Sequence, residues 1–100
     1  MSKTKIVISY KLKKGVNEEE FLDSAKRLND EYMSKQKGYI SWQQLREKDI
    51  WVDSLTFESL EDAKAIENNR DPNPLAEKFY SYIKLMSCKT NYYSIERDYK

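Results

Sequence analysis

Residues 39–63 read YISWQQLREKDIWVDSLTFESLEDA, and they combine two alternating segments with the start of a helix. The alternation of apolar and polar residues predicts strands at 39–46 and 50–57. The polar residues 47–49 between them predict the turn of a hairpin. Ser59 is a preferred N-cap residue, and an acid follows three positions later at the spacing of a capping box. A helix should therefore begin directly after the second strand of the hairpin.

A strand and a helix are also expected before this hairpin. Residues 5–13 alternate, which predicts a strand that ends before Gly15. Asn17 is a good N-cap, and Gly38 is expected to be the C′ residue of the helix that follows. The apolar face of this helix recurs at i, i+4, i+7 and i+11, in Phe21, Ala25, Leu28 and Tyr32.

The helix that begins at Ser59 is predicted to be broken before it reaches the last strand. Asp71 and Asn73 each precede a proline, which disfavours helical geometry at both residues. Pro74 suits the first position of a new helix, with Asn73 as its cap. An apolar stripe follows in Leu75, Phe79, Tyr82 and Ile83, and the last strand is expected at 87–95. Two purposes are open for the break, simple helix geometry or a gate over a pocket.

The resulting order, β-α-β-β-α-β, predicts an α+β fold of the ferredoxin-like type in one domain over residues 1–100. Right-handed crossovers give a four-stranded antiparallel sheet with the helices on one face. Both faces of this sheet carry apolar residues, and nothing in the chain is left to cover the second face. We therefore expect a homodimer that pairs the two sheets. Trp42, expected to face away from Tyr39, could line a pocket or the dimer interface, and it is assigned to the interface because tryptophan anchors interfaces.

The composition excludes several classes of function. The net charge is +1 with a pI near 7.7, so no nucleic-acid partner is expected. The absence of a signal sequence or a long apolar run, together with a single cysteine, predicts a cytoplasmic protein without a membrane partner. With no histidine and one cysteine, His-based catalysis and structural zinc sites are excluded, and neither a metal nor a cofactor is expected.

Carboxylates and phenols are therefore the groups left for acid–base chemistry. Asp53 shares a strand face with Leu55 and Phe57 and should point toward the helices, where burial raises a carboxyl pKa toward values suited to a general base. The alternative is a solvated Asp53 near an open end, or one paired with Arg or Lys. Phe57 is either a core aromatic or a ligand contact. The candidate pocket residues are Tyr10, Leu55, Phe57, Phe79 and Tyr80, with Tyr10, Tyr80 and Tyr92 as candidate phenol donors.

Two segments resemble the dimeric α/β-barrel superfamily that includes the antibiotic biosynthesis monooxygenases. Residues 37–40 (KGYI) are similar to its "P-G-F" segment, and residues 52–63 (VDSLTFESLEDA) to its "W-E-S-x-E-x-A" segment. The resemblance implies a ferredoxin-like fold, a homodimer whose sheets form a barrel, and a pocket between sheet and helices. Some members of the superfamily oxidise polycyclic phenols without metal or flavin, and others oxidise quinols or degrade haem.

The functional residues of the superfamily are only partly present. Phe57 stands at the position of the motif tryptophan, and Asp53 stands where the phenol-oxidising members have an asparagine. The residues that the haem-degrading members use correspond to Ile8, Phe57 and Tyr80, and with no histidine in the chain the haem ligand is missing. The sequence thus suggests a cofactor-independent monooxygenase-like protein with a small aromatic-ligand pocket of the phenol or quinol class and Asp53 as the proton acceptor. The alternative is a dimeric module that binds a small ligand, or acts in stress, without catalysis.

Overall fold

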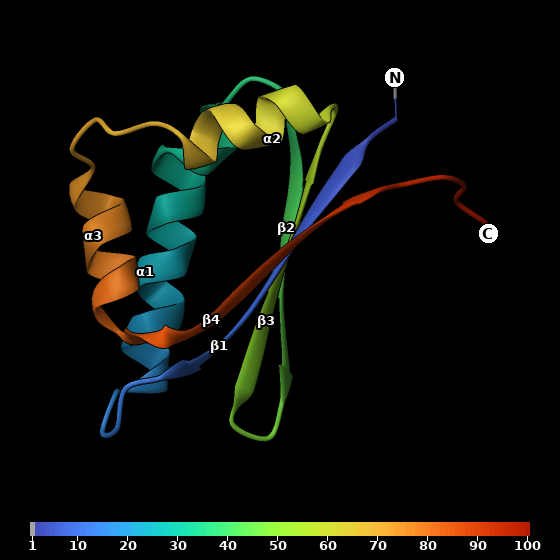
Figure 1. The fold of residues 1–100 in the computed structure, drawn as a ribbon. Coiled ribbons are helices and arrows are strands. Elements are labelled where there is room, and N and C mark those ends of the chain that lie inside the picture. The colour runs from blue at the N-terminus through green and yellow to red at the C-terminus, as the bar shows by residue number, and fades with distance from the viewer. Residues whose placement is uncertain (1) are drawn as a thin grey trace.

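A computed structural model of the protein describes residues 2–100. Its elements are β1 (Thr4–Leu12), α1 (Glu18–Glu31), the short 3₁₀ helix η1 (Met33–Lys35), β2 (Tyr39–Glu47), β3 (Ile50–Phe57), α2 (Leu60–Glu67), α3 (Pro74–Ser81) and β4 (Ile83–Ser94). The four strands form one antiparallel sheet in the order β2-β3-β1-β4. All three α-helices lie on the same side of this twisted sheet (Figure 1). The predicted ferredoxin-like fold is confirmed.

The helices begin where the sequence predicts them, because each has a side chain that caps its first turn. Asn17 accepts a hydrogen bond from the backbone N–H of Glu20, and Ser59 accepts one from that of Asp62. Asn73 accepts from two backbone N–H groups of the first turn of α3, which has Pro74 as its first residue. The predicted break is confirmed, since α2 ends at Glu67 and α3 begins at Pro74.

Two predicted boundaries are wrong. The last strand begins at Ile83 and not at residue 87, so Ile83 does not extend the apolar stripe of α3 and is buried as the first residue of β4. Helix α1 ends at Glu31 and η1 follows it, so Gly38 is not the C′ residue of that helix. Gly38 has a φ of 80°, and a Cβ atom there would collide with the side chain of Asp62. Its role is to let the start of β2 pass close to α2.

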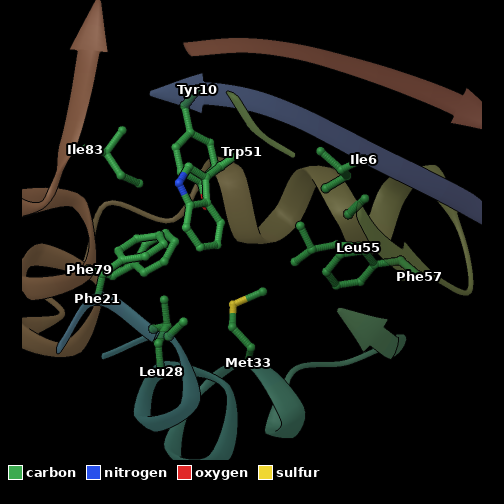
Figure 2. Close-up of a cluster of buried hydrophobic side chains, with 12 residues drawn as sticks. Ile6, Tyr10, Phe21, Leu28, Met33, Trp51, Leu55, Phe57, Phe79 and Ile83 are labelled. Carbon is green, nitrogen blue, oxygen red and sulfur yellow. The ribbon is translucent and has the colours of Figure 1, made fainter. Parts of the chain in front are cut away.

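The core lies between the sheet and the helices and is rich in aromatic rings (Figure 2). Phe21 of α1 is fully buried and stacks on Phe79 of α3, with ring centroids 5.2 Å apart. Trp51 of β3 meets Phe21 edge-on at 5.1 Å. These contacts hold α1 and α3 against the centre of the sheet, beside the side chains that β1 and β3 direct inward.

An irregularity in β2 decides where Trp42 points. The register between β2 and β3 shifts between Tyr39 and Ser41, after which Trp42 pairs with Leu55. The rings of both Tyr39 and Trp42 therefore lie on the helix side, against Phe57 and Phe79 respectively. This corrects the expected orientation of Trp42 opposite to Tyr39 and places its ring on the helix side of the sheet, away from the face expected to form the dimer interface.

Candidate functional site

The site is built around Asp53, a carboxylate in the middle of β3 on the face toward the helices. Its side chain is only 3% exposed, and Tyr10 Oη donates a hydrogen bond of 2.8 Å to Asp53 Oδ1. The ion pairs found within residues 2–100 all lie at the surface, and none of them includes Asp53. The orientation predicted for Asp53 is therefore observed, and the alternative of a solvated or ion-paired carboxylate is wrong.

The sheet register brings the two polar side chains together. Asp53 pairs with Ile8, and Tyr10 pairs with Trp51, so Tyr10 and Asp53 occupy diagonal positions on adjacent strands. All four of these side chains belong to the same face, because residues directly opposite each other in a ladder share a face. The tyrosine side chain is long enough to span this diagonal, so the hydroxyl group of Tyr10 reaches the carboxylate of Asp53.

Burial dominates the electrostatics of this pair. It raises the pKa of Asp53 from 3.8 to about 6, although the neighbouring donors of Tyr10, Trp42 and Gln44 act in the opposite direction. Burial first, and the Asp53 charge second, also raise the pKa of Tyr10 well above its ordinary value. Tyr10 consequently stays protonated as a donor, while Asp53 changes its protonation state close to neutral pH.

Asp53 faces a small cavity between the sheet and the helices. The cavity has a volume of about 70 Å³, and its lining is Ile8, Tyr10, Leu28, Met33, Trp42, Asp53, Leu55, Phe79, Tyr80, Ile83 and Cys88. Most of these side chains are apolar, so the carboxyl group and the Tyr10 hydroxyl are polar groups in a largely dry surrounding. Tyr80 remains 47% exposed and therefore stands between this cavity and solvent.

Four of the five residues predicted for the pocket line this cavity, namely Tyr10, Leu55, Phe79 and Tyr80. Phe57 is fully buried and packs edge-on against Tyr39, outside the lining, which corrects its assignment to the pocket. Tyr92 also lies outside the lining. Cys88 is a half-buried free thiol at the cavity, and burial followed by the Asp53 charge raises its pKa, so it stays protonated.

Two further donors lie near Asp53: Gln44, which was not predicted from the sequence to belong to the site, and Trp42, which was assigned to the dimer interface in preference to a pocket. Trp42 Nε1 and Gln44 Nε2 are buried, and neither has a hydrogen-bond partner within residues 2–100. Gln44 pairs with Asp53 across the ladder, and Trp42 lines the cavity itself. The available signal was their period-two spacing on one strand, which places both on the same face once the register shift before Ser41 is known.

A larger groove lies elsewhere, on the outside of the helices. It has a volume of about 260 Å³ between α1 and α3, and its lining includes Glu20, Asp23, Arg27 and Lys78. These charges belong to solvated helix faces and none of them is near the Asp53–Tyr10 pair. In the part of the chain that the structure describes, no group of three or more His, Cys, Asp and Glu side chains is placed to hold a metal ion. The same residues contain no helix of the length and apolarity that a membrane span requires.

The sequence matches no protein-family model and no curated protein. Solved structures do match along nearly the whole chain. One is SnoaB of Streptomyces nogalater, a cofactor-independent oxygenase, with a TM-score of 0.78 at 14% identity over 98% of this chain and 97% of that one. The chain shares the fold of this protein.

Two further matches show that proteins with this fold have different activities. A candidate antibiotic biosynthesis monooxygenase of Nitrosomonas europaea has a TM-score of 0.72 at 14% identity, over 95% of this chain and 91% of that one. A heme-degrading protein of Mycobacterium tuberculosis has a TM-score of 0.68 at 14% identity, over 99% and 97% of the two chains. Because this one fold carries different activities, any activity of the present chain has to be argued from its own site.

Proposed function

We propose that the chain is a cofactor-independent monooxygenase-like protein that acts on a small aromatic ligand of the phenol or quinol class. The single observation that carries the proposal is Asp53, a buried carboxylate that faces an apolar cavity and has a pKa of about 6. A carboxylate in such surroundings is a stronger base than one in water, and its pKa lies near the pH of catalysis. The fold shared with SnoaB is consistent with this chemistry.

In the proposed reaction, Asp53 takes a proton from the substrate and Tyr10 holds the carboxylate in place. The resulting anion reacts with O₂ at a ring carbon that carries hydrogen. One oxygen atom ends as a new carbonyl group on the substrate and the other leaves as water, so the substrate itself supplies all the electrons. The protein contributes position, a dry cavity and the proton acceptor.

The size of the cavity requires that the site opens for a ligand. About 70 Å³ is well below the roughly 300 Å³ at which small-molecule pockets begin. Two lining side chains can make room, since Tyr80 is half in solvent and Met33 is unbranched and adaptable. Residues 68–73 between α2 and α3 lie outside both helices and are mostly exposed, so a change of backbone conformation there would let Tyr80 swing away from the cavity. This supports the gate interpretation of the helix break over simple geometry.

We further propose that the working unit is a homodimer formed through the outer face of the sheet. The helices leave this face uncovered (Figure 1). Val7 and Val52 lie on its central strands, and Leu45 and Tyr93 are about half exposed on the outer ones. Sedimentation at micromolar concentration should give a species of twice 12.0 kDa, and a monomer alone would contradict the dimer.

Oxygen uptake by metal-free protein tests the activity. The substrates are a panel of hydroquinones and polycyclic phenols, and the proteins are the wild type, Asp53→Asn, and Asp98→Asn as a matched control in the exposed C-terminal tail. We expect turnover by the wild type and the control, with a loss of about 10²-fold or more in Asp53→Asn, the usual contribution of a general base. Equal rates in all three proteins would remove Asp53 from the mechanism.

The small volume of the cavity specifically favours one second candidate, a module that binds an aromatic ligand without converting it. In that case the panel gives no oxygen uptake, but ligands still bind and Asp53→Asn changes their affinity. Oxygen uptake distinguishes the two candidates, and tryptophan fluorescence measures the binding that both require, because Trp42 lines the cavity.

A further inference from the structure

Trp42 presents an unused donor to the cavity that Asp53 faces. Its Nε1 atom is buried and has no hydrogen-bond partner among the residues that the structure describes. The indole is held edge-on against Phe79, with centroids 5.5 Å apart. Buried donors in proteins are normally paired, and one left without a partner at a site calls for a functional explanation.

The position of this donor relative to Asp53 follows from the sheet register. Trp42 pairs with Leu55, two residues after Asp53 on β3, and the side chains of Trp42 and Asp53 line the same cavity. When Asp53 takes a proton from a bound phenol, that negative charge moves from the carboxylate to the ligand oxygen. An unpaired donor in the lining of the same small cavity is then available to this new oxyanion.

We infer that the Trp42 indole N–H binds the phenolate oxygen of the ligand beside Asp53. The inference rests on the proposed function, in which the cavity takes up a phenol, and it adds the residue that selects the ionised hydroxyl. Gln44 pairs with Asp53 across the ladder but does not line the cavity, so it is not assigned to the ligand.

A binding experiment with para-nitrophenolate tests this assignment without any turnover. The Asp53→Asn variant serves as the background, because it removes the carboxylate that competes for the donor and repels the anion. Adding Trp42→Phe to this background should weaken binding of para-nitrophenolate about tenfold, which corresponds to about 1.4 kcal/mol. Binding of nitrobenzene, which lacks the phenolate oxygen, should change less than twofold. Equal losses for both probes, or no binding of the phenolate by Asp53→Asn, would overturn the inference.

A spectroscopic measurement keeps the test valid if Trp42→Phe does not fold. The chain has two tryptophans, so the indole N–H region of a ¹⁵N–¹H spectrum contains two side-chain signals. The Trp42 signal should move downfield as the phenolate is added, while that of Trp51, buried against Phe21, serves as the internal reference. If no substrate causes oxygen uptake, the oxygenase activity is disproved, but the shift of the Trp42 signal can still be observed and the donor assignment is still tested. An unshifted Trp42 signal with saturated probe defeats only the donor assignment.

Discussion

The Asp53→Asn substitution should stabilise the protein at alkaline pH and not at acidic pH. The pKa of the Asp53 carboxyl is about 6 in the folded protein, against an ordinary value of 3.8 that describes the unfolded chain. Between these two values the folded protein binds more protons than the unfolded chain. The free energy of unfolding therefore falls as the pH rises from about 4 to about 6, and the loss is complete above that range.

The magnitude follows from the distance between the two pKa values. A difference of about two pKa units, at about 1.4 kcal/mol each, gives a penalty of about 3 kcal/mol for the charged form at pH 8. Asparagine is neutral at every pH, and its Oδ1 still accepts the hydrogen bond from Tyr10. Because the unfolded carboxyl is already partly ionised at pH 4, the difference in unfolding free energy between Asp53→Asn and the wild type should be about 2.5 kcal/mol more favourable to the variant at pH 8 than at pH 4.

Urea unfolding at pH 4 and pH 8, followed by tryptophan fluorescence and circular dichroism, measures this difference. Protein concentration is held constant, because dimerisation contributes to apparent stability. Asp98→Asn, in the exposed tail, is the matched control and should show no such pH dependence. A pH-independent difference for Asp53→Asn would show that the pKa of Asp53 is the same in the folded and unfolded protein, and a difference of opposite sign would show that the carboxylate is stabilised in the fold.

Three further substitutions test other parts of the account. Tyr10→Phe removes a donor that favours the charged carboxylate, so the pKa of Asp53 should rise above about 6 and the pH dependence of urea unfolding should exceed that of the wild type; an unchanged dependence would contradict this. Phe79→Ala should cost about 3–5 kcal/mol, because the ring is 4% exposed and stacks on Phe21, whereas Tyr99→Ala at an 83% exposed site should stay within about 0.5 kcal/mol in the same denaturation assay. Gly38→Ala should destabilise more than Gly15→Ala, since both have positive φ but only a Cβ at Gly38 meets Asp62; equal losses in melting temperature would show that this close approach is unimportant.

Local signals explain why so much of the fold could be predicted from the sequence. The N-caps Asn17, Ser59 and Asn73 each act within three residues, so their hydrogen bonds are visible in the sequence alone. The start of β4 was missed for a related reason. Ile83 satisfies the helical spacing from Leu75 and Phe79, and only packing against the sheet decides that the helix ends at Ser81.

The site depended more on long-range information. The alternation of residues along β3 correctly predicted that Asp53 points toward the helices. Asp53 is buried because β3 lies between two other strands of the sheet. The partnership of Asp53 with Tyr10 needs the register of β1 against β3, which no local pattern contains. Trp42 was assigned to the wrong face because a register shift near the start of β2 reverses the alternation that the sequence suggests.

The proposed chemistry depends on a buried Asp53 carboxyl that titrates near neutral pH inside the cavity. A ¹³C-detected NMR titration of the aspartate carboxyl carbons measures this pKa, with the Asp53 signal assigned through its absence in Asp53→Asn. We expect a midpoint of about 6 for Asp53. A midpoint at or below the ordinary value of 3.8 would contradict it, because the carboxylate would then be too weak a base for the proposed chemistry.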